Sequence, residues 1–116
     1  MAIIRTFEDI ESWVKARKLA DEIFRISNRE NMRRDFALKD QVNRSIGSVM
    51  DNIAEGFERG GNKEFIQYLF IAKGSAGETR SQLYRMLDRQ CISKFQKTNL
   101  IEYSMNLNKL AECFWG

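Results

Sequence analysis

No proline interrupts the 116 residues of this chain, and its apolar side chains recur at intervals of three and four almost throughout. Proline would remove a helical hydrogen bond, and apolar residues three or four apart share one face of a helix. The pattern therefore predicts long amphipathic helices. No segment alternates apolar and polar side chains for long enough to predict a strand, so we expect an all-α protein.

Four apolar stripes are separated by polar or glycine-rich breaks, of which the Gly60-Gly61 pair is the clearest. Thr6 and Asp9 have capping-box spacing, so the first helix is expected to begin near Phe7, and Asn62 is expected to cap the third. Short turns between four helices predict an antiparallel up-down-up-down bundle, built as one domain over residues 1–116. The stripes span residues 7–28, 38–57, 62–88 and 95–114.

The residue types that are missing exclude several classes of function. The chain contains no histidine, which excludes Ser-His-Asp and Cys-His catalysis, histidine-ligated zinc and the Glu-x-x-His motif of di-iron bundles. We therefore expect no enzyme activity, no cofactor and no metal. Cys91 and Cys113 lie about 30 Å apart if one helix joins them, at roughly 1.5 Å per residue, so they are expected to be unpaired thiols.

Apolar runs are too short for a membrane span, which needs roughly 20 residues, and the charged start does not resemble a secretory signal. A cytoplasmic protein without a membrane partner is expected.

Charge is expected to separate along the bundle axis. In an up-down bundle, residues 25–44 and 80–99 meet at one end, with eleven basic and four acidic residues. Residues 1–14, 51–68 and 102–116 meet at the other end, with four basic and nine acidic residues. Three interpretations stay open: ordinary solvated helix faces, an assembly dipole, or a basic end that binds phosphate. For the last, the candidate contacts are Arg29, Arg33, Arg34, Arg85, Arg89, Lys94 and Lys97.

Polar side chains adjoin the apolar stripes of the second and third predicted helices. If these helices are antiparallel neighbours, the two rows are expected to hydrogen-bond across the seam or to specify a subunit contact. A catalytic pair formed by the two glutamates is the less favoured alternative, because no nucleophile or metal shell accompanies them. The candidates are Ser48, Asn52 and Glu55 on one helix and Ser75 and Glu78 on the other.

Glycines and off-stripe aromatics point to a further packing surface. Gly47, Gly74 and Gly77 lie inside predicted helices, where each costs about 1 kcal/mol relative to alanine, so a second backbone is expected to approach them. That backbone is either within the bundle or in another subunit. Phe70 and Tyr84 lie off the third stripe, and Trp115 lies near the end of the sequence. They favour a subunit interface, with base stacking on Tyr84 as an alternative.

The blocks N-I-A-E-G-F at residues 52–57, K-E-F-I at 63–66 and I-A-K-G-S at 71–75 resemble the 23S rRNA intervening sequence family of four-helix bundles. The opening residues Phe7, Trp13 and Ala16 agree with that family's start. Met50, Asp51 and the pair Ala76-Gly77 depart from its usual pattern. The resemblance implies a homo-oligomer, with a homopentamer as the best expectation, and it supplies no catalytic residues. A more distant resemblance of fold links the family to the nucleic-acid-binding accessory pentamer of retroelements.

Two functional hypotheses follow. In the first, a non-enzymatic oligomer binds RNA or DNA through its basic end by phosphate contacts. In the second, the chain is a protein-binding scaffold or adaptor without affinity for nucleic acid.

Overall fold

The computed structural model describes residues 3–102, and helices make up most of them. A 3₁₀ turn, η1 (Phe7–Asp9), precedes the long helices α1 (Glu11–Ser27), α2 (Phe36–Glu58) and α3 (Asn62–Asp88). Residues 94–102 form a further helical segment. Within residues 3–102 no strand occurs, which confirms the prediction of an all-α fold.

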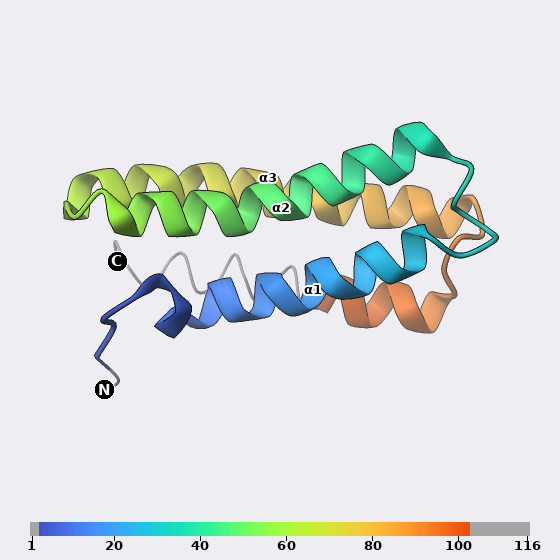
Figure 1. The fold of residues 1–116 in the computed structure, drawn as a ribbon. Coiled ribbons are helices and arrows are strands. Elements are labelled where there is room, and N and C mark those ends of the chain that lie inside the picture. The colour runs from blue at the N-terminus through green and yellow to red at the C-terminus, as the bar shows by residue number, and fades with distance from the viewer. Residues whose placement is uncertain (1–2, 103–116) are drawn as a thin grey trace.

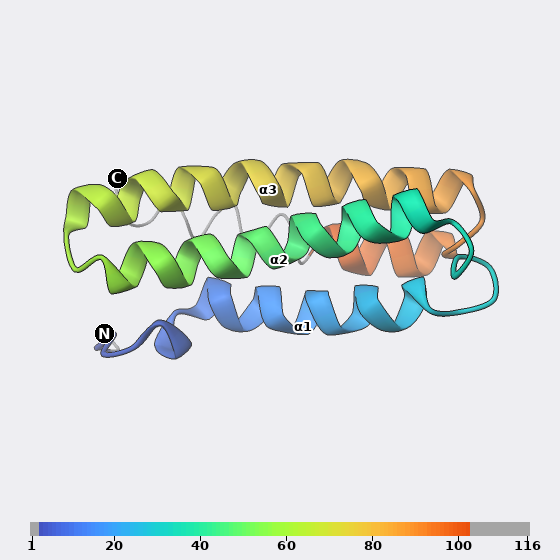
Figure 2. The ribbon, with the colours of Figure 1, turned by 45° about the horizontal axis from the view of Figure 1, so that its top comes forward.

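The helices run alternately up and down the long axis of the molecule (Figures 1 and 2). α2 returns antiparallel to α1, α3 returns antiparallel to α2, and the segment 94–102 runs back opposite to α3 (Figure 1). The predicted antiparallel four-helix arrangement is therefore confirmed. Two of the three turns lie at one end of the bundle, so segments far apart in the sequence meet there.

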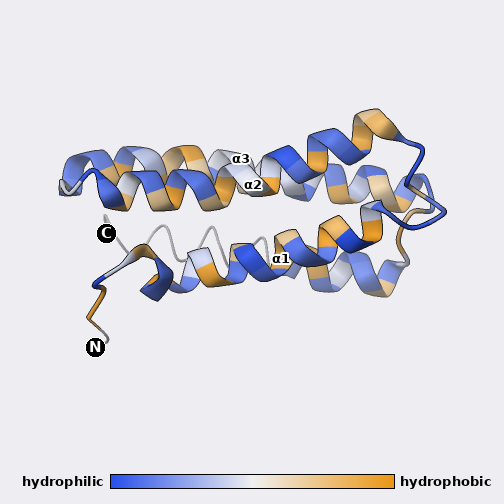
Figure 3. Ribbon diagram, in the orientation of Figure 1, coloured by the Kyte–Doolittle hydropathy of each residue, from blue (hydrophilic) through white to orange (hydrophobic). Residues whose placement is uncertain are grey.

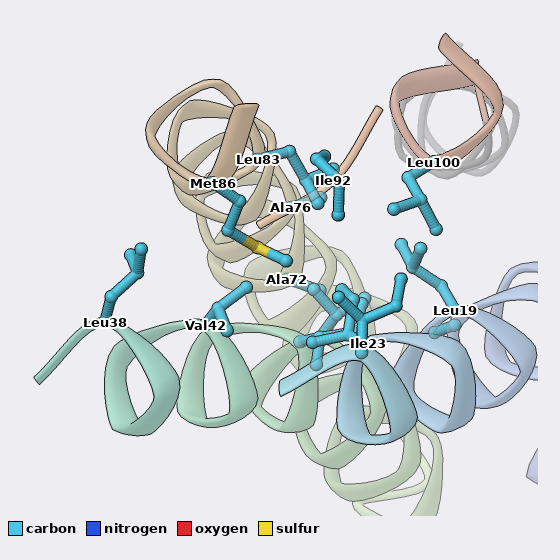
Figure 4. Close-up of a cluster of buried hydrophobic side chains, with 14 of the residues drawn as sticks. Leu19, Ile23, Leu38, Val42, Ala72, Ala76, Leu83, Met86, Ile92 and Leu100 are labelled. Carbon is cyan, nitrogen blue, oxygen red and sulfur yellow. The ribbon is translucent and has the colours of Figure 1, made fainter. Parts of the chain in front are cut away.

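The core lies between the helices, and each of them contributes to it (Figure 4). Leu19 and Ile23 of α1, Val42 of α2, Leu83 of α3 and Leu100 of the last segment are at most 2% exposed. Hydrophobic residues recur between hydrophilic ones along each helix (Figure 3), as expected when one face of a helix is buried and the other faces solvent. Burying one such aliphatic side chain contributes roughly 1.5–3 kcal/mol, so the apolar stripes are the main source of stability.

The first helix begins later than the sequence predicted. Asp9 accepts a hydrogen bond from the Thr6 backbone N–H at 3.1 Å, so the capping pair forms, but it caps η1 and not α1. Ile10 then adopts an extended backbone, with φ −78° and ψ 119°, and buries its side chain. This extended residue breaks the helical path, and α1 starts at Glu11.

Two further expectations need correction. The N-cap of α3 is Gly61, and Asn62 is the first helical residue. Phe95 lies near the start of the last helical segment as expected, but it is 76% exposed and does not join the core. Cys91 is buried and unpaired. Cys113 and Trp115, like most of the fourth apolar stripe, lie outside the described residues.

Gly56 is the glycine at which two helices approach closely. A Cβ atom added to Gly56 of α2 would lie 2.5 Å from the Cβ of Tyr68 on α3, much closer than two carbon atoms can pack. Apart from the local backbone of their own helices, no atom of residues 3–102 lies within 4 Å of such a Cβ at Gly47, Gly74 or Gly77. Among the described residues these three glycines therefore do not mark a close approach of a second backbone.

Gln90 ends α3 in a conformation that usually requires glycine. Its φ is +62°, in the left-handed region. The Gln90 N–H donates to the Leu87 carbonyl at 3.0 Å, and the Cys91 N–H donates to the Met86 carbonyl at 2.8 Å. These two bonds form a Schellman motif, whose left-handed position is most often glycine because a Cβ atom is strained there.

Replacing Gly56 with alanine is expected to destabilise the bundle. The overpacking against Tyr68 costs about 1–3 kcal/mol, which exceeds the roughly 1 kcal/mol gained from alanine's helix propensity. Urea denaturation measures the difference. Gly47→Ala is the matched control, because the space around Gly47 is open, and its free energy of unfolding should rise. Equal stabilisation of both variants would contradict the close approach at Gly56.

Replacing Gln90 with glycine is expected to stabilise the fold by about 1 kcal/mol, because glycine relieves the left-handed strain. Thermal unfolding should show a midpoint raised by a few degrees. Gln90→Ala is the control, since it shortens the side chain but keeps the Cβ atom and should show no such increase. A lower midpoint for the glycine variant would contradict this account of the α3 terminus.

Candidate nucleic-acid interface

One end of the bundle gathers the end of α1, the start of α2, the end of α3 and the start of segment 94–102 (Figure 1). We call this the basic end and define it as residues 25–44 and 80–99. It contains eleven basic and four acidic residues. At the opposite end, residues 3–14 and 51–68 contain three basic and seven acidic residues. The topology thus places the two charge clusters at opposite ends of the long axis.

Asp35 links the α1–α2 loop to the end of α3. One of its carboxylate oxygens accepts the backbone N–H of Leu38 at 3.3 Å and so caps α2. The other lies 2.6 Å from the Arg89 guanidinium. The hydrogen bond from Arg89 is the main cause that lowers the pKa of Asp35, so the carboxylate stays ionised well into the acidic range. Of the predicted phosphate contacts, Arg89 is thus already held by an acidic partner.

Three other predicted contacts also have side-chain partners. Arg33 lies 3.0 Å from Glu30 on the same loop, in an exposed ion pair. Arg85 donates to the Gln41 side-chain oxygen of α2 at 2.7 Å. The Lys97 ammonium lies 5.1 Å from the centroid of the Tyr84 ring, within the range of a cation–π contact.

Arg29, Arg34 and Lys94 complete the predicted set. All three are exposed, and none forms an ion pair within residues 3–102. The first two come from the α1–α2 loop and the third opens the last helical segment, so two separate turns supply them. Exposed cations without a carboxylate partner are the groups that can engage a phosphate at no cost in broken ion pairs.

Exposed aromatic rings accompany these cations. Four of the large hydrophobic side chains that the structure shows exposed belong to the basic end or its margin: Phe24 (58%), Phe36 (74%), Tyr84 (49%) and Phe95 (76%). The sequence indicated Tyr84 only. Phe36 could have been found by its position, because it precedes the stripe that begins at Leu38 and is out of phase with it. Phe95 was included in the fourth stripe, although it lies five residues before Leu100 and is therefore out of phase with that stripe.

The predicted polar rows meet between α2 and α3. The hydroxyls of Ser48 and Ser75 lie 2.8 Å apart, and the Asn52 side-chain amide donates to Ser48 Oγ at 3.0 Å. One turn further, the Thr79 hydroxyl lies 2.8 Å from Ser45 Oγ. Gln82 continues this row, accepting from the Ser45 hydroxyl at 2.6 Å. Ser45 and Thr79 were not among the predicted contacts, although each lies one helical turn from a residue that was, Ser48 and Ser75 respectively.

The two glutamates of these rows do not share a site. Glu55 is exposed and accepts hydrogen bonds from Arg59 at 2.7 Å and from the Tyr68 hydroxyl of α3 at 3.1 Å. These bonds, that of Arg59 first, lower the pKa of Glu55. Glu78 is exposed on α3. The geometry therefore gives no carboxylate pair that could act as general acid and base.

Neither a metal-ligating cluster nor a reactive thiol occurs in the part of the chain that the structure describes. No cluster of three or more metal-ligating side chains occurs within residues 3–102. Burial is the main cause that raises the pKa of the Cys91 thiol, which therefore stays protonated and weakly nucleophilic at neutral pH. No helix among the described residues is long and apolar enough to cross a membrane.

Comparisons with known proteins place this fold. The family of 23S rRNA-intervening sequence proteins matches over residues 8–112. A crystal structure of a protein of unknown function from the S23 ribosomal protein family of Bacteroides thetaiotaomicron is similar, with a TM-score of 0.80 and 25% sequence identity. The match covers 90% of this chain and 99% of that one. A comparison with curated proteins found no match. The resemblance carried by residues 52–57 and the following blocks is confirmed: the chain belongs to the 23S rRNA-intervening sequence protein family.

Proposed function

We propose that the protein is a non-enzymatic oligomer whose basic end binds the phosphate backbone of RNA or another nucleic acid. One observation carries the proposal: Arg29, Arg34 and Lys94 are exposed, and none forms an ion pair within residues 3–102, on the end that also exposes four aromatic rings. Basic side chains release counterions when they neutralise phosphates, and exposed rings stack on bases without regard to sequence.

The remaining predicted contacts support this proposal to different degrees. Arg33 and Glu30 form an exposed pair of the kind that contributes about 0–1 kcal/mol, so Arg33 is able to exchange Glu30 for a phosphate at small cost. Arg89 is less available, because Asp35 both pairs with it and caps α2. The order of contribution that we propose is therefore the three unpaired cations, then Arg33, Arg85 and Lys97, and last Arg89.

Self-association is the second part of the proposal. Gly74 and Gly77 lie on α3 with open space where a side chain would be, although glycine costs helix stability at both positions. The exposed side chain of Ile71 lies on the same helix. A second copy packed on α3 would use this space, and a ring of copies, with five as our expectation, would bring several basic ends together. Multivalency would then strengthen weak contacts at each protomer.

The names of the relatives fit RNA as the first ligand to test. The family is described by the 23S rRNA intervening sequence, and the similar crystal structure is assigned to a ribosomal protein family with unknown function. The alternative, a protein-binding scaffold without affinity for nucleic acid, is favoured by the same α3 surface. The two functions differ in whether RNA binds at all.

Reversing two of the unpaired charges is expected to weaken RNA binding without harming the fold. In Arg34→Glu with Lys94→Glu, two phosphate contacts are lost, and the slope of log K against log salt should become shallower by about 1.4–1.8. Fluorescence anisotropy at several salt concentrations measures both quantities. An acidic residue at the first position of segment 94–102 also suits the helix dipole, so stability should not fall.

The matched control changes the same net charge at the opposite end of the bundle, with Arg5→Glu and Lys63→Glu. Both side chains are exposed there. This variant should bind RNA with the wild-type salt slope. Equal losses in the two double variants would show only a general charge effect and would contradict a site at the basic end. No binding by the wild-type protein at low salt would favour the scaffold.

A polar side chain at Gly77 is expected to dissociate the oligomer. Gly77→Gln meets open space among residues 3–102, so the protomer should fold, while a neighbour packed on α3 would be displaced. Light scattering after size exclusion should show the mass falling toward the protomer's 13.6 kDa. Gly47→Gln on α2 is the control, since its surroundings are equally open and its mass should not change. An unchanged mass for Gly77→Gln would contradict an interface on α3.

A further inference from the structure

A cleft opens at the basic end between the α1–α2 loop and the turn that follows α3. Its volume is about 460 Å³, within the roughly 300–1,000 Å³ typical of small-molecule sites. Leu87, Cys91 and Ile92 supply apolar surface. The polar lining consists of one cation, one hydroxyl and three side-chain amides: Arg29, Ser93, Asn31, Gln90 and Gln96.

Much of the hydrogen-bonding capacity of this lining is unused. Ser93 and Gln96 cap the last helical segment reciprocally: Gln96 Oε1 accepts the Ser93 N–H at 2.9 Å, and Ser93 Oγ accepts the Gln96 N–H at 3.1 Å. This leaves the Ser93 hydroxyl proton and the Gln96 side-chain NH₂ as donors that neither of these two bonds uses. Within residues 3–102, the side chains of Asn31 and Gln90 make no hydrogen bond either. The cleft therefore offers both hydrogen-bond donors and acceptors.

Gln90 lines this cleft with a strained backbone conformation. Its left-handed backbone, with φ +62°, would be relaxed by glycine. A glycine at this position would end α3 equally well but would remove an amide from the cleft. Strained residues of this kind gather at functional sites, and here the strained residue lines a cleft.

A second, smaller hollow of about 150 Å³ adjoins the cleft and shares Arg29 and Gln96 with it. Phe95 and Glu22 also line this hollow. The Glu22 carboxylate disfavours a phosphate inside the hollow, whereas the exposed Phe95 ring suits a flat, uncharged group. The two hollows therefore combine a cation, amides and an aromatic ring around a space better suited to a base than to an anion.

We propose that this cleft receives one unpaired base of single-stranded RNA while the surrounding cations hold the neighbouring phosphates. The inference rests on the proposed function and adds a substrate class to it. The amides would hydrogen-bond the edge of the base, and Phe95 or the Arg29 guanidinium would stack on its face, which is how proteins recognise unstacked bases in RNA. A duplex keeps its bases stacked and paired, so it can offer only phosphates to this end.

The test compares three fluorescent RNA probes at one salt concentration: a short single strand, the same strand with its bases removed, and the duplex. The wild-type protein should bind the intact single strand about tenfold more tightly than the abasic strand, because one stacked base contributes on that scale. The abasic strand measures the phosphate contacts alone.

Two variants locate the base. Gln90→Gly removes an amide from a more stable protein, and Phe95→Ala removes the ring; each should reduce the preference to about twofold and leave abasic binding unchanged. Gln67→Ala is the matched control, because Gln67 carries an exposed side-chain amide at the opposite end of the bundle and lines neither hollow. It should keep the tenfold preference.

The outcomes separate this inference from the function on which it rests. Equal binding of intact and abasic strands by the wild-type protein overturns the base site and leaves phosphate binding standing. A preference that survives both Gln90→Gly and Phe95→Ala overturns this cleft as the site. Absence of binding to all three probes at low salt overturns both proposals together.

Discussion

The rest of the structure depends on the close antiparallel packing of α2 against α3. Gly56 allows the helices to touch at Tyr68, and a row of small hydroxyl side chains continues the contact toward the basic end. Residue numbers of the paired side chains sum to between 123 and 127 along the whole seam, from Glu55 with Tyr68 to Asp35 with Arg89. A single register therefore governs contacts at both ends. Because hydroxyls buried without partners are costly, a shift of either helix by one turn would be strongly opposed.

This register also determines which basic side chains of the described residues are left without an acidic partner and are therefore available to bind a phosphate. It brings Arg85 to Gln41 and Arg89 to Asp35, so these two arginines link the end of α3 to the start of α2. The α1–α2 loop and the last turn lie outside the seam, and among the described residues Arg29, Arg34 and Lys94 form no ion pair there. Asp35 forms its ion pair with Arg89 as long as its carboxylate is ionised. Because the pKa of Asp35 is lowered in the folded protein, this ion pair contributes its full stability at pH values above the ordinary aspartate pKa. The contribution is lost as the pH falls through the lowered pKa.

The helices and their topology could be predicted from the sequence because helical periodicity is a local signal. The stripes of α2 and α3, the break at Gly60-Gly61 and the meeting of Ser48 with Ser75 all follow from spacing within a helix and from antiparallel topology. Contacts that join distant segments are different. Nothing near Asp35 indicates that its partner is Arg89, 54 positions later, or that Glu55 would face solvent and Tyr68.

Backbone conformation at the α3 terminus was equally invisible in the sequence. The left-handed Gln90 has no glycine to mark it, and the exposed Phe95 lies within the predicted span of the fourth stripe. Both depend on how the chain turns after α3, which is set by tertiary contacts such as the burial of Cys91 and Ile92. The cleft lined by Gln90 is therefore a feature of the folded chain alone.

The proposed assembly and the proposed binding would use separate parts of α3, so that one could support the other. The open glycines Gly74 and Gly77 lie in the middle of the helix, whereas the cleft and the unpaired cations lie beyond its end. A neighbour packed on the middle of α3 would leave the basic end of each protomer accessible. Since like charges repel, gathering several basic ends in one ring is unfavourable unless a polyanion neutralises them. The proposed oligomer and the proposed ligand would thus stabilise each other, and RNA binding should be linked to assembly by mass action.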